Sequence, residues 1–283
     1  MFLFDEAFID GWLGRRPASI TPLARPVLPE TASLGFSCHS LLYQAVAPGD
    51  CGDLGAYWTG TMDIAYAGFS SLKQRWDANG VDRTGSYSGA LIVTEIGDLQ
   101  TGLADPASAQ GIETLQHLYW FALTAQLKGC KLFGIYPPHS PEGMNLDADA
   151  MAKAVYWQQW LSAWPEITIP VHVIPVPVMV RAMIDRFAPA SVYADGLHLK
   201  TDVYGAPNQM NNALGQMVRM FLTGQRPAND PGWNAEMVTL VDDAWSILQA
   251  HACTGLGGAT VITPFPVAAD PLPQPAALPG APT

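Results

Sequence analysis

Charged residues are scarce in this chain of 283 residues, in which Asp, Glu, Lys and Arg together make up only 14%. Basic residues are scarcer than acidic ones. The chain has 14 Lys and Arg against 25 Asp and Glu, which gives a formal net charge of -11. A chain of this charge has no general electrostatic attraction to phosphate backbones or to anionic lipid. The composition therefore argues against a nucleic-acid partner.

The sequence also lacks any apolar run of the roughly 18 to 20 residues that a membrane-spanning helix needs. We therefore expect no membrane span and a soluble protein. Residues 1–16 carry acidic side chains where a secretory signal peptide would have its basic start, so no export signal is visible there. The choice between a cytoplasmic protein and one exported with a removed signal stays open.

Metal-binding and cofactor-binding motifs are absent as well. The four cysteines, Cys38, Cys51, Cys130 and Cys253, show no CxxC or CxxH spacing, which argues against a structural zinc site. Two disulfides stay open, but Cys130 directly precedes a predicted strand, and buried free thiols are the simpler expectation. The chain contains no HExxH motif, phosphate-binding glycine loop or dinucleotide fingerprint. The sequence thus indicates neither a metal nor an organic cofactor.

Short apolar runs, in contrast, are abundant and alternate with segments of helical periodicity. Five runs predict buried strands at residues 32–37, 62–67, 89–94, 131–136 and 169–174. Longer segments predict helices at residues 108–129, 146–164, 176–188, 201–224 and 234–251. This alternation predicts an α/β fold with a doubly wound, mostly parallel five-stranded sheet and helices on both faces. Ligands in such sheets bind beyond the carboxyl ends of the strands, so functional residues should follow the strands.

The two ends of the chain differ from the middle. Residues 1–31 form a proline-punctuated arm, and residues 263–283 form a tail that contains seven prolines in 21 residues. Because proline prevents a continuous helix, we expect an extended arm along the surface and a mobile, extended tail. The predicted domain therefore spans residues 32–262.

Three candidate nucleophiles lie at and just after the end of the first predicted strand, namely Ser37, Cys38 and Ser40. A serine becomes a nucleophile when a base takes its proton and nearby donors receive the charge that develops on the attacked carbonyl. Ser40 fits best, because the next helix begins there while Ser37 still belongs to the strand. The alternative is that Ser40 only caps this helix. His39 is a poor candidate for the base, since neighbouring side chains on a turn usually diverge.

A second polar motif, "DGLH" at residues 195–198, follows the last predicted strand and helix of the sheet. Asp195 and His198 lie three residues apart on a turn with Gly196 between them. This spacing lets a carboxylate orient the imidazole while the other ring nitrogen faces outward. The alternative is that Asp195 only turns the chain ahead of a helix.

These two motifs resemble those of the SGNH, or GDSL-type, serine hydrolases. That family ends its first strand in Gly-Asp-Ser-Leu, and this chain reads "CHSL" there, at residues 38–41. The last motif of the family is Asp-x-x-His, which "DGLH" at residues 195–198 matches. Gly68, after the second strand, takes the place of the family's glycine whose amide faces the oxyanion. The resemblance covers roughly residues 32–227.

The third family motif, Gly-x-Asn-Asp after the third strand, is missing, because residues 94–98 read "TEIGD". A charged Glu95 would repel an oxyanion unless it were protonated or turned aside. Thr94 and Glu95 are therefore candidate substrate contacts of a divergent subfamily. The loop after the fourth strand adds His139 and Asn145 as further candidates, with turn residues as the favoured alternative.

Three tryptophans, Trp157, Trp160 and Trp164, fall on one face of the helix predicted at residues 146–164. Tryptophans at this spacing usually pack into a core, and a sugar-stacking platform is the alternative. We expect the core-facing stripe.

The resemblance implies a three-layer, flavodoxin-like fold and a serine esterase without metal or cofactor. In this hypothesis Ser40, His198 and Asp195 form the catalytic triad, and the amides of Ser40 and Gly68 form the oxyanion hole. The implied substrate is a small acyl ester, such as an O-acetyl ester of a carbohydrate. An O-acyltransferase with the same triad and a non-catalytic carbohydrate-binding protein stay open as alternatives, as does the oligomeric state.

Overall fold

The computed structural model describes residues 23–47, 53–200, 210–267 and 275–279. Five strands form one parallel sheet in the order β2-β1-β3-β4-β5. The strands are β1 (Leu34–Cys38), β2 (Met62–Tyr66), β3 (Ala90–Val93), β4 (Leu132–Ile135) and β5 (Val171–Val173). Each lies within two residues of its expected bounds, so the prediction of a doubly wound α/β sheet is confirmed.

Helices connect the strands and complete the fold. They are α2 (Ser40–Val46), α3 (Asp53–Tyr57), α4 (Leu72–Ala78), α5 (Val81–Thr84), α6 (Ala109–Leu127), α7 (Asp147–Ser162), α8 (Val176–Phe187), α9 (Pro189–Val192), α10 (Met210–Thr223) and α11 (Ala235–Ala250), followed by the short 3-10 helix η2 (Ala252–Thr254). The first part of the helix predicted at residues 201–224 lies outside the described residues. Within the described ranges, no helix is both long and apolar enough to cross a bilayer.

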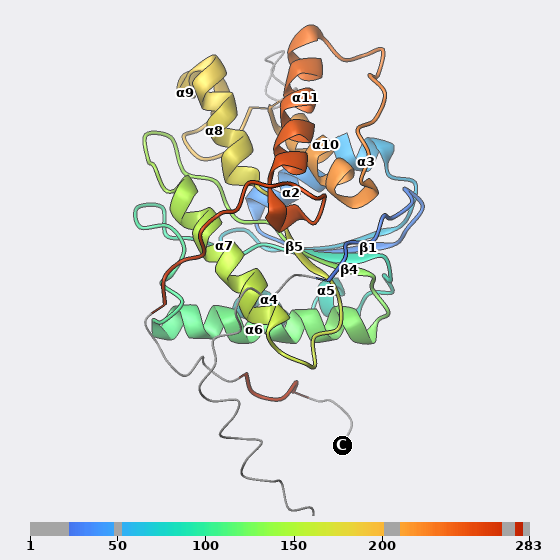
Figure 1. Ribbon diagram of the computed structural model, residues 1–283, viewed down its shortest axis with the longest axis vertical. Coiled ribbons are helices and arrows are strands. Elements are labelled where there is room, and N and C mark those ends of the chain that lie inside the picture. Colours follow the sequence, from blue (N-terminus) through green and yellow to red (C-terminus); the bar gives the residue numbers. More distant parts are fainter. Residues whose placement is uncertain (1–22, 48–52, 201–209, 268–274, 280–283) are drawn as a thin grey trace, which may run out of the picture.

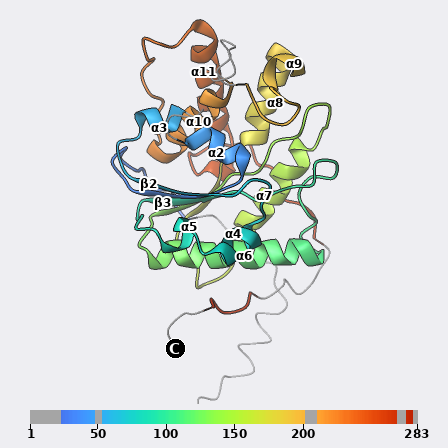
Figure 2. The same ribbon diagram turned by 180° about the vertical axis from the view of Figure 1, so that it is seen from behind.

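Helices cover both faces of the sheet and give three layers (Figures 1 and 2). α4, α5, α6 and α7 lie on one face, and α2, α3, α8, α10 and α11 lie on the other. The side chains of β3 alternate between the two cores: Ala90 and Ile92 join one, and Leu91 and Val93 join the other. A strand that buries both faces must be apolar throughout, which explains the continuous apolar runs of the sequence.

Two expectations about core residues are confirmed. Trp157 and Trp160 of α7 are buried, and Trp164, two residues after the end of α7, is partly buried against the same core, so the three tryptophans face the core. Cys38, Cys130 and Cys253 are buried free thiols, and Cys51 lies outside the described residues.

The described parts of the proline-rich tail contain no helix and lie against α6 and α7. The amide of Phe265 donates to the carbonyl oxygen of Ala152 at 2.9 Å. The carbonyl oxygen of Ala276 accepts a hydrogen bond from Trp120 Nε1 at 3.0 Å. Side chains and main-chain groups of both helices therefore hold this extended segment.

The strand order creates a switch point at the centre of the sheet. The chain passes from β1 to β2 on one side and then crosses to β3 on the other side of β1. The loops after β1 and β3 therefore leave in opposite directions, and a crevice opens between them at the carboxyl edge. This crevice is where a binding site is expected in a doubly wound sheet.

Candidate active site

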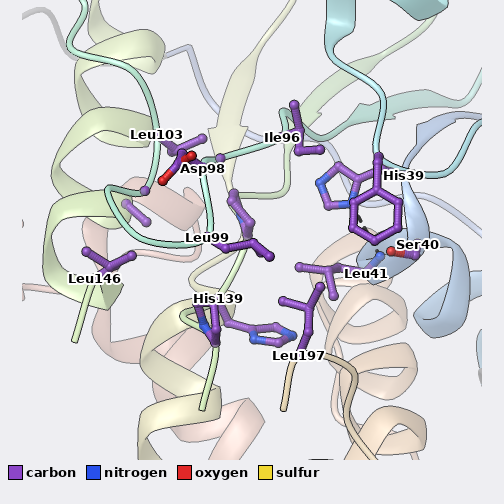
Figure 3. A pocket seen from close by; sticks show the side chains of 16 residues that line it. His39, Ser40, Leu41, Ile96, Asp98, Leu99, Leu103, His139, Leu146 and Leu197 are labelled. Atoms are coloured by element: carbon purple, nitrogen blue, oxygen red, sulfur yellow. Dashed lines mark hydrogen bonds between the residues drawn. The ribbon is translucent and has the colours of Figure 1, made fainter. Parts of the chain in front are cut away.

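A cavity of about 220 Å³ lies at this carboxyl edge (Figure 3). Its walls come from the segment after β1, the loop after β3, the loop after β4, the start of α7, and the turn that follows α9. The polar side chains on its wall are His39, Ser40, Asp98 and His139. Phe69, in the turn after β2, also lines the cavity, which thus unites residues from the segments that follow four strands of the sheet, β1, β2, β3 and β4.

Ser40 is the one among the three candidate nucleophiles that lines the cavity. Ser37 is fully buried, and its hydroxyl accepts a hydrogen bond from Arg75 Nε at 2.9 Å. Cys38 is also fully buried, and burial raises the pKa of its thiol far above the usual range, so no thiolate forms at neutral pH. Ser40 is the first residue of α2, and His39 is the N-cap, so the interpretation of Ser40 as the cap is wrong.

His39 uses both of its ring nitrogens in structural hydrogen bonds. Nδ1 accepts from the amide of Leu41 at 3.3 Å and is therefore unprotonated. Nε2 carries the proton, donates to the carbonyl oxygen of Glu95 at 3.1 Å and lies 3.0 Å from Thr94 Oγ1. Burial lowers the pKa of His39 to about 3, so the ring is neutral. With its basic nitrogen occupied, His39 cannot take a proton from Ser40.

Asp195 organises the turn that sequence reasoning singled out. Its Oδ1 accepts from the amides of Leu197 at 3.0 Å and His198 at 2.7 Å, and its Oδ2 lies 2.7 Å from His198 Nδ1. Gly196 adopts φ +84°, a left-handed conformation that the tight turn requires and that glycine permits without strain. Burial raises the pKa of Asp195, but the hydrogen bonds from His198 and Leu197 outweigh it and hold the pKa below its usual range. The carboxylate is therefore ionised at neutral pH.

The turn is fixed to the loop after β4. The amide of Glu142 donates to the carbonyl oxygen of Gly196 at 2.7 Å, and Tyr193 Oη donates to the carbonyl oxygen of Ser140 at 2.7 Å. Within the turn, the amide of Ala194 donates to the carbonyl oxygen of His198 at 2.7 Å. The imidazole is thus held by a turn that is itself part of the cavity edge.

His198 has the protonation pattern that a general base needs. Because Nδ1 donates to the Asp195 carboxylate, Nε2 is the unprotonated nitrogen of the neutral ring. Nε2 is buried and makes no hydrogen bond with any described residue.

The structure pairs Asp195 with His198 but does not join this pair to Ser40. No hydrogen bond links Ser40 Oγ to His198 Nε2, since Nε2 has no partner among the described residues. Catalytic hydrogen bonds are often long or unformed before substrate binds. The structure therefore shows Asp195 and His198 as an oriented pair in the turn beside the cavity that Ser40 lines, and the triad stays a prediction.

Glu95 is turned away from the cavity. Its carboxyl group accepts from the amides of Leu72 at 3.1 Å and Ile96 at 2.7 Å and from Thr114 Oγ1 at 3.1 Å. Burial raises the pKa of Glu95 to about 7. Glu95 and Thr94 are both buried and stand outside the cavity wall, where they connect β3 to α4, α6 and His39. The structure therefore turns the Glu95 carboxyl group aside from the cavity and gives it a structural role.

Of the three other predicted site residues, His139 lines the cavity, and Gly68 and Asn145 do not. His139 lines the cavity, and its Nδ1 donates to the carbonyl oxygen of Ser140 at 3.0 Å, which leaves Nε2 as the acceptor. Gly68 lies in an exposed turn next to Phe69, and Phe69 lines the cavity while Gly68 does not. Asn145 is exposed and lies off the cavity wall. The oxyanion roles of the Ser40 and Gly68 amides stay predictions.

Sequence reasoning missed Arg75, which holds the carboxyl ends of β1 and β3 together. This buried side chain donates to Ser37 Oγ, to the hydroxyl and carbonyl oxygens of Ser70, and to the carbonyl oxygen of Thr94. It lies in the ordinary polar stretch "SSLKQRWD", where nothing sets it apart from an exposed helix residue. The aliphatic residues of the loop after β3 were also missed, and their apolar character within a glycine-containing loop was the available signal.

The residues that resemble the SGNH motifs therefore gather at one edge of the sheet. Ser40 lines the cavity, and Asp195 and His198 are paired in the turn that contributes Leu197 to the cavity wall. The family's asparagine has no counterpart, since Thr94 and Glu95 are used structurally. No protein-family model, curated protein or solved structure matches this chain.

Proposed function

We propose that the protein is a serine hydrolase that cleaves an ester of a small acyl group. In this proposal Ser40 is the nucleophile, His198 is the general base and acid, and Asp195 orients the imidazole. The observation that carries the proposal is the Asp195–His198 pair, in which the unprotonated Nε2 of His198 has no partner within the part of the chain that the structure describes and lies in the turn that borders the cavity. A buried imidazole nitrogen without a partner is costly for a structural residue, and it suits a residue that binds a reacting group.

The first half of the reaction transfers the acyl group to the enzyme. Ser40 Oγ attacks the carbonyl carbon of the ester, its proton moves to His198 Nε2, and the carbonyl electron pair moves to the oxygen. Collapse of this intermediate breaks the bond to the alcohol, which leaves with the proton from His198. Asp195 holds the ring and stabilises the imidazolium throughout.

The second half releases the acyl group. Water gives its proton to His198 Nε2 and attacks the acyl-enzyme, and the proton returns to Ser40 as the carboxylic acid leaves. The amides of Ser40 and Gly68 are the proposed donors to the oxyanion. The amide of Leu41 is not available for this role, because it already donates to His39 Nδ1.

Labelling with a fluorophosphonate, followed by mass spectrometry, tests the nucleophile. We expect the label on Ser40, and we expect Ser40→Ala to lose both labelling and ester turnover. Ser37→Ala is the matched control, because the buried Ser37 hydroxyl faces Arg75 and not the cavity.

A label found on another residue, or one that survives in Ser40→Ala, would contradict the assignment. Binding of an ester or a saccharide without turnover and without labelling would identify a non-catalytic binding protein.

A further inference from the structure

The cavity wall is mainly aliphatic. Its aliphatic side chains include Leu41, Ile96, Leu99, Leu103, Leu146 and Leu197. Among the polar groups, the ring nitrogens of His39 are occupied, and Asp98 Oδ1 already accepts from the amides of Gln100 and Thr101. Few side chains are therefore left to pair with sugar hydroxyls, and a hydroxyl buried without a partner is unfavourable.

The cavity extends away from Ser40 toward α7. In Figure 3, Ser40 and Leu41 lie at one end and Leu103 and Leu146 at the other. Ala150 follows Leu146 by four residues, on the same face of the helix, and also lines the cavity. A chain attached to Ser40 and lying in the cavity would therefore end against α7.

The size of the cavity exceeds that of an acetyl group. Its volume is about 220 Å³. A water molecule takes up about 30 Å³ of liquid and a methylene group is of similar size, so this space holds about seven such groups. An acetyl group would leave most of an aliphatic cavity unfilled.

The loop that forms one wall is held in a fixed shape. The amides of Asp98 and Gly102 donate to each other's carbonyl oxygens at 2.8 Å. Gly97 packs so closely on Gly102 that a Cβ atom there would lie 2.9 Å from the Gly102 carbonyl carbon. Lys153 Nζ donates a hydrogen bond to the carbonyl oxygen of Leu103 at 2.6 Å. A wall fixed in this way can select ligands by length.

The rim of the cavity is apolar as well. Phe69 and Leu99 both line the cavity, and they are 65% and 50% exposed. Phe69 adopts φ 51°, a left-handed conformation that is strained for an aromatic residue. Strained residues tend to cluster at functional sites, and this one presents an aromatic ring to solvent at the entrance.

From the aliphatic wall, the volume and the apolar rim, we infer that the cavity binds the alkyl part of the acyl group. The preferred substrates are then esters of medium-length acyl chains, of about four to eight carbons, and not acetates. This inference rests on the proposed function, since it places the ester carbonyl at Ser40.

A series of p-nitrophenyl esters with a constant alcohol part and a lengthening acyl chain tests the inference. We expect kcat/KM to rise by about fourfold for each added methylene from acetate to hexanoate or octanoate. The value should fall for dodecanoate, whose chain exceeds the cavity. A matching series of alkyl acetates should show no such rise.

Two variants with opposite effects sharpen the test. Ala150→Leu fills the end of the cavity and should shift the best chain to a shorter one by two or more carbons. Leu103→Ala enlarges the cavity and should shift it to a longer one. Ala148→Leu is the matched control, because Ala148 lies on α7 but is exposed and off the cavity wall, and it should leave the profile unchanged.

Several results would overturn the inference. These are a best rate with acetate, identical profiles for Ala150→Leu and Ala148→Leu, or a length dependence that follows the alcohol and not the acyl chain.

Calorimetric binding of hexanoate and acetate to Ser40→Ala separates this inference from the proposed function. One outcome is that no ester is turned over, but hexanoate binds more tightly than acetate and Ala150→Leu removes this difference in affinity. In that case the proposed hydrolase function is rejected and the inference of an alkyl-binding cavity is supported. If hexanoate binds no more tightly than acetate, the inference of an alkyl-binding cavity is wrong, whether or not the protein hydrolyses esters.

Discussion

His39 and His198 lie close to the same cavity, yet their surroundings differ in the one respect that matters for catalysis. Both ring nitrogens of His39 are bonded to main-chain groups, at the start of α2 and at the end of β3. His198 has one nitrogen bonded to a carboxylate and the other without a partner among the described residues. This difference, and not proximity to the serine in the sequence, is why we propose His198 as the general base.

The two imidazole rings also differ in the charged groups that surround them. Burial lowers the pKa of His39 to about 3, and its ring nitrogens bond no carboxylate of the described residues that would offset this. His198 Nδ1 lies 2.7 Å from the Asp195 carboxylate, which in the proposed mechanism stabilises the imidazolium that forms when Ser40 gives up its proton. The proposal therefore gives the two rings different roles: His39 stays neutral, and His198 accepts and returns the proton.

The largest expected effect separates the two histidines by activity. His198→Ala should lower kcat/KM for the ester by roughly 10³-fold or more, because the base is lost. Its free energy of unfolding should change by only about 1 kcal/mol, since the pair that it breaks is partly exposed. Steady-state kinetics and chemical denaturation measure the two quantities on the same preparation.

His39→Ala is the counterpart in this comparison and should show the reverse pattern. It removes a helix cap and leaves the buried Thr94 hydroxyl short of a partner, at a cost of about 1–3 kcal/mol. Turnover per folded molecule should fall far less than in His198→Ala. If His39→Ala folds but loses more of its kcat/KM than His198→Ala does, His39 and not His198 is the general base.

Much of this comparison was accessible from the sequence. The strands follow from continuous apolar runs, and the turn at residues 195–198 follows from the spacing of Asp195, Gly196 and His198, whose contacts are local. Strand order then places Ser40 at the switch point of the sheet. Features set by short-range patterns were therefore predictable.

The remainder depends on contacts between distant parts of the chain. His39 is neutral because it is buried at a place where it also meets the carbonyl oxygen of Glu95, 56 residues away, and the carboxyl group of Glu95 is turned toward Thr114. Arg75 holds two strand ends that are far apart in the sequence. Periodicity carries no information on such partners, so the sequence predicted Glu95 as a substrate contact while the structure gives it a buried structural role.

The smallest expected effect concerns the pH dependence of stability. The pKa of Glu95 is raised by burial to about 7, so between its ordinary value of 4.5 and about 7 the folded protein keeps a proton that the unfolded chain releases. Stability from this group therefore falls as the pH rises through that window. His39 acts in the opposite direction, because its folded pKa of about 3 lies below the ordinary value of 6.5, and stability rises with pH between the two.

Glu95→Gln removes the first contribution and leaves the second. In urea denaturation between pH 4.5 and pH 7, the variant should therefore gain more stability with rising pH than the native protein does. The slope and not the absolute value is compared, since the substitution also alters hydrogen bonds to Leu72 and Thr114. An unchanged slope would mean that the Glu95 carboxyl group is ionised throughout this range.

The most direct test of the catalytic pair is the kcat/KM of Asp195→Asn, of His198→Ala and of the double variant. If Asp195 orients His198, Asp195→Asn should preserve the fold and lower the rate by roughly 10³- to 10⁴-fold, because an amide can favour the wrong imidazole tautomer. The double variant should then be little worse than the more damaged single variant, since the residues act as one unit. Losses that multiply in the double variant, or near-normal turnover in Asp195→Asn, would contradict the proposal and leave residues 195–198 as an ordinary turn.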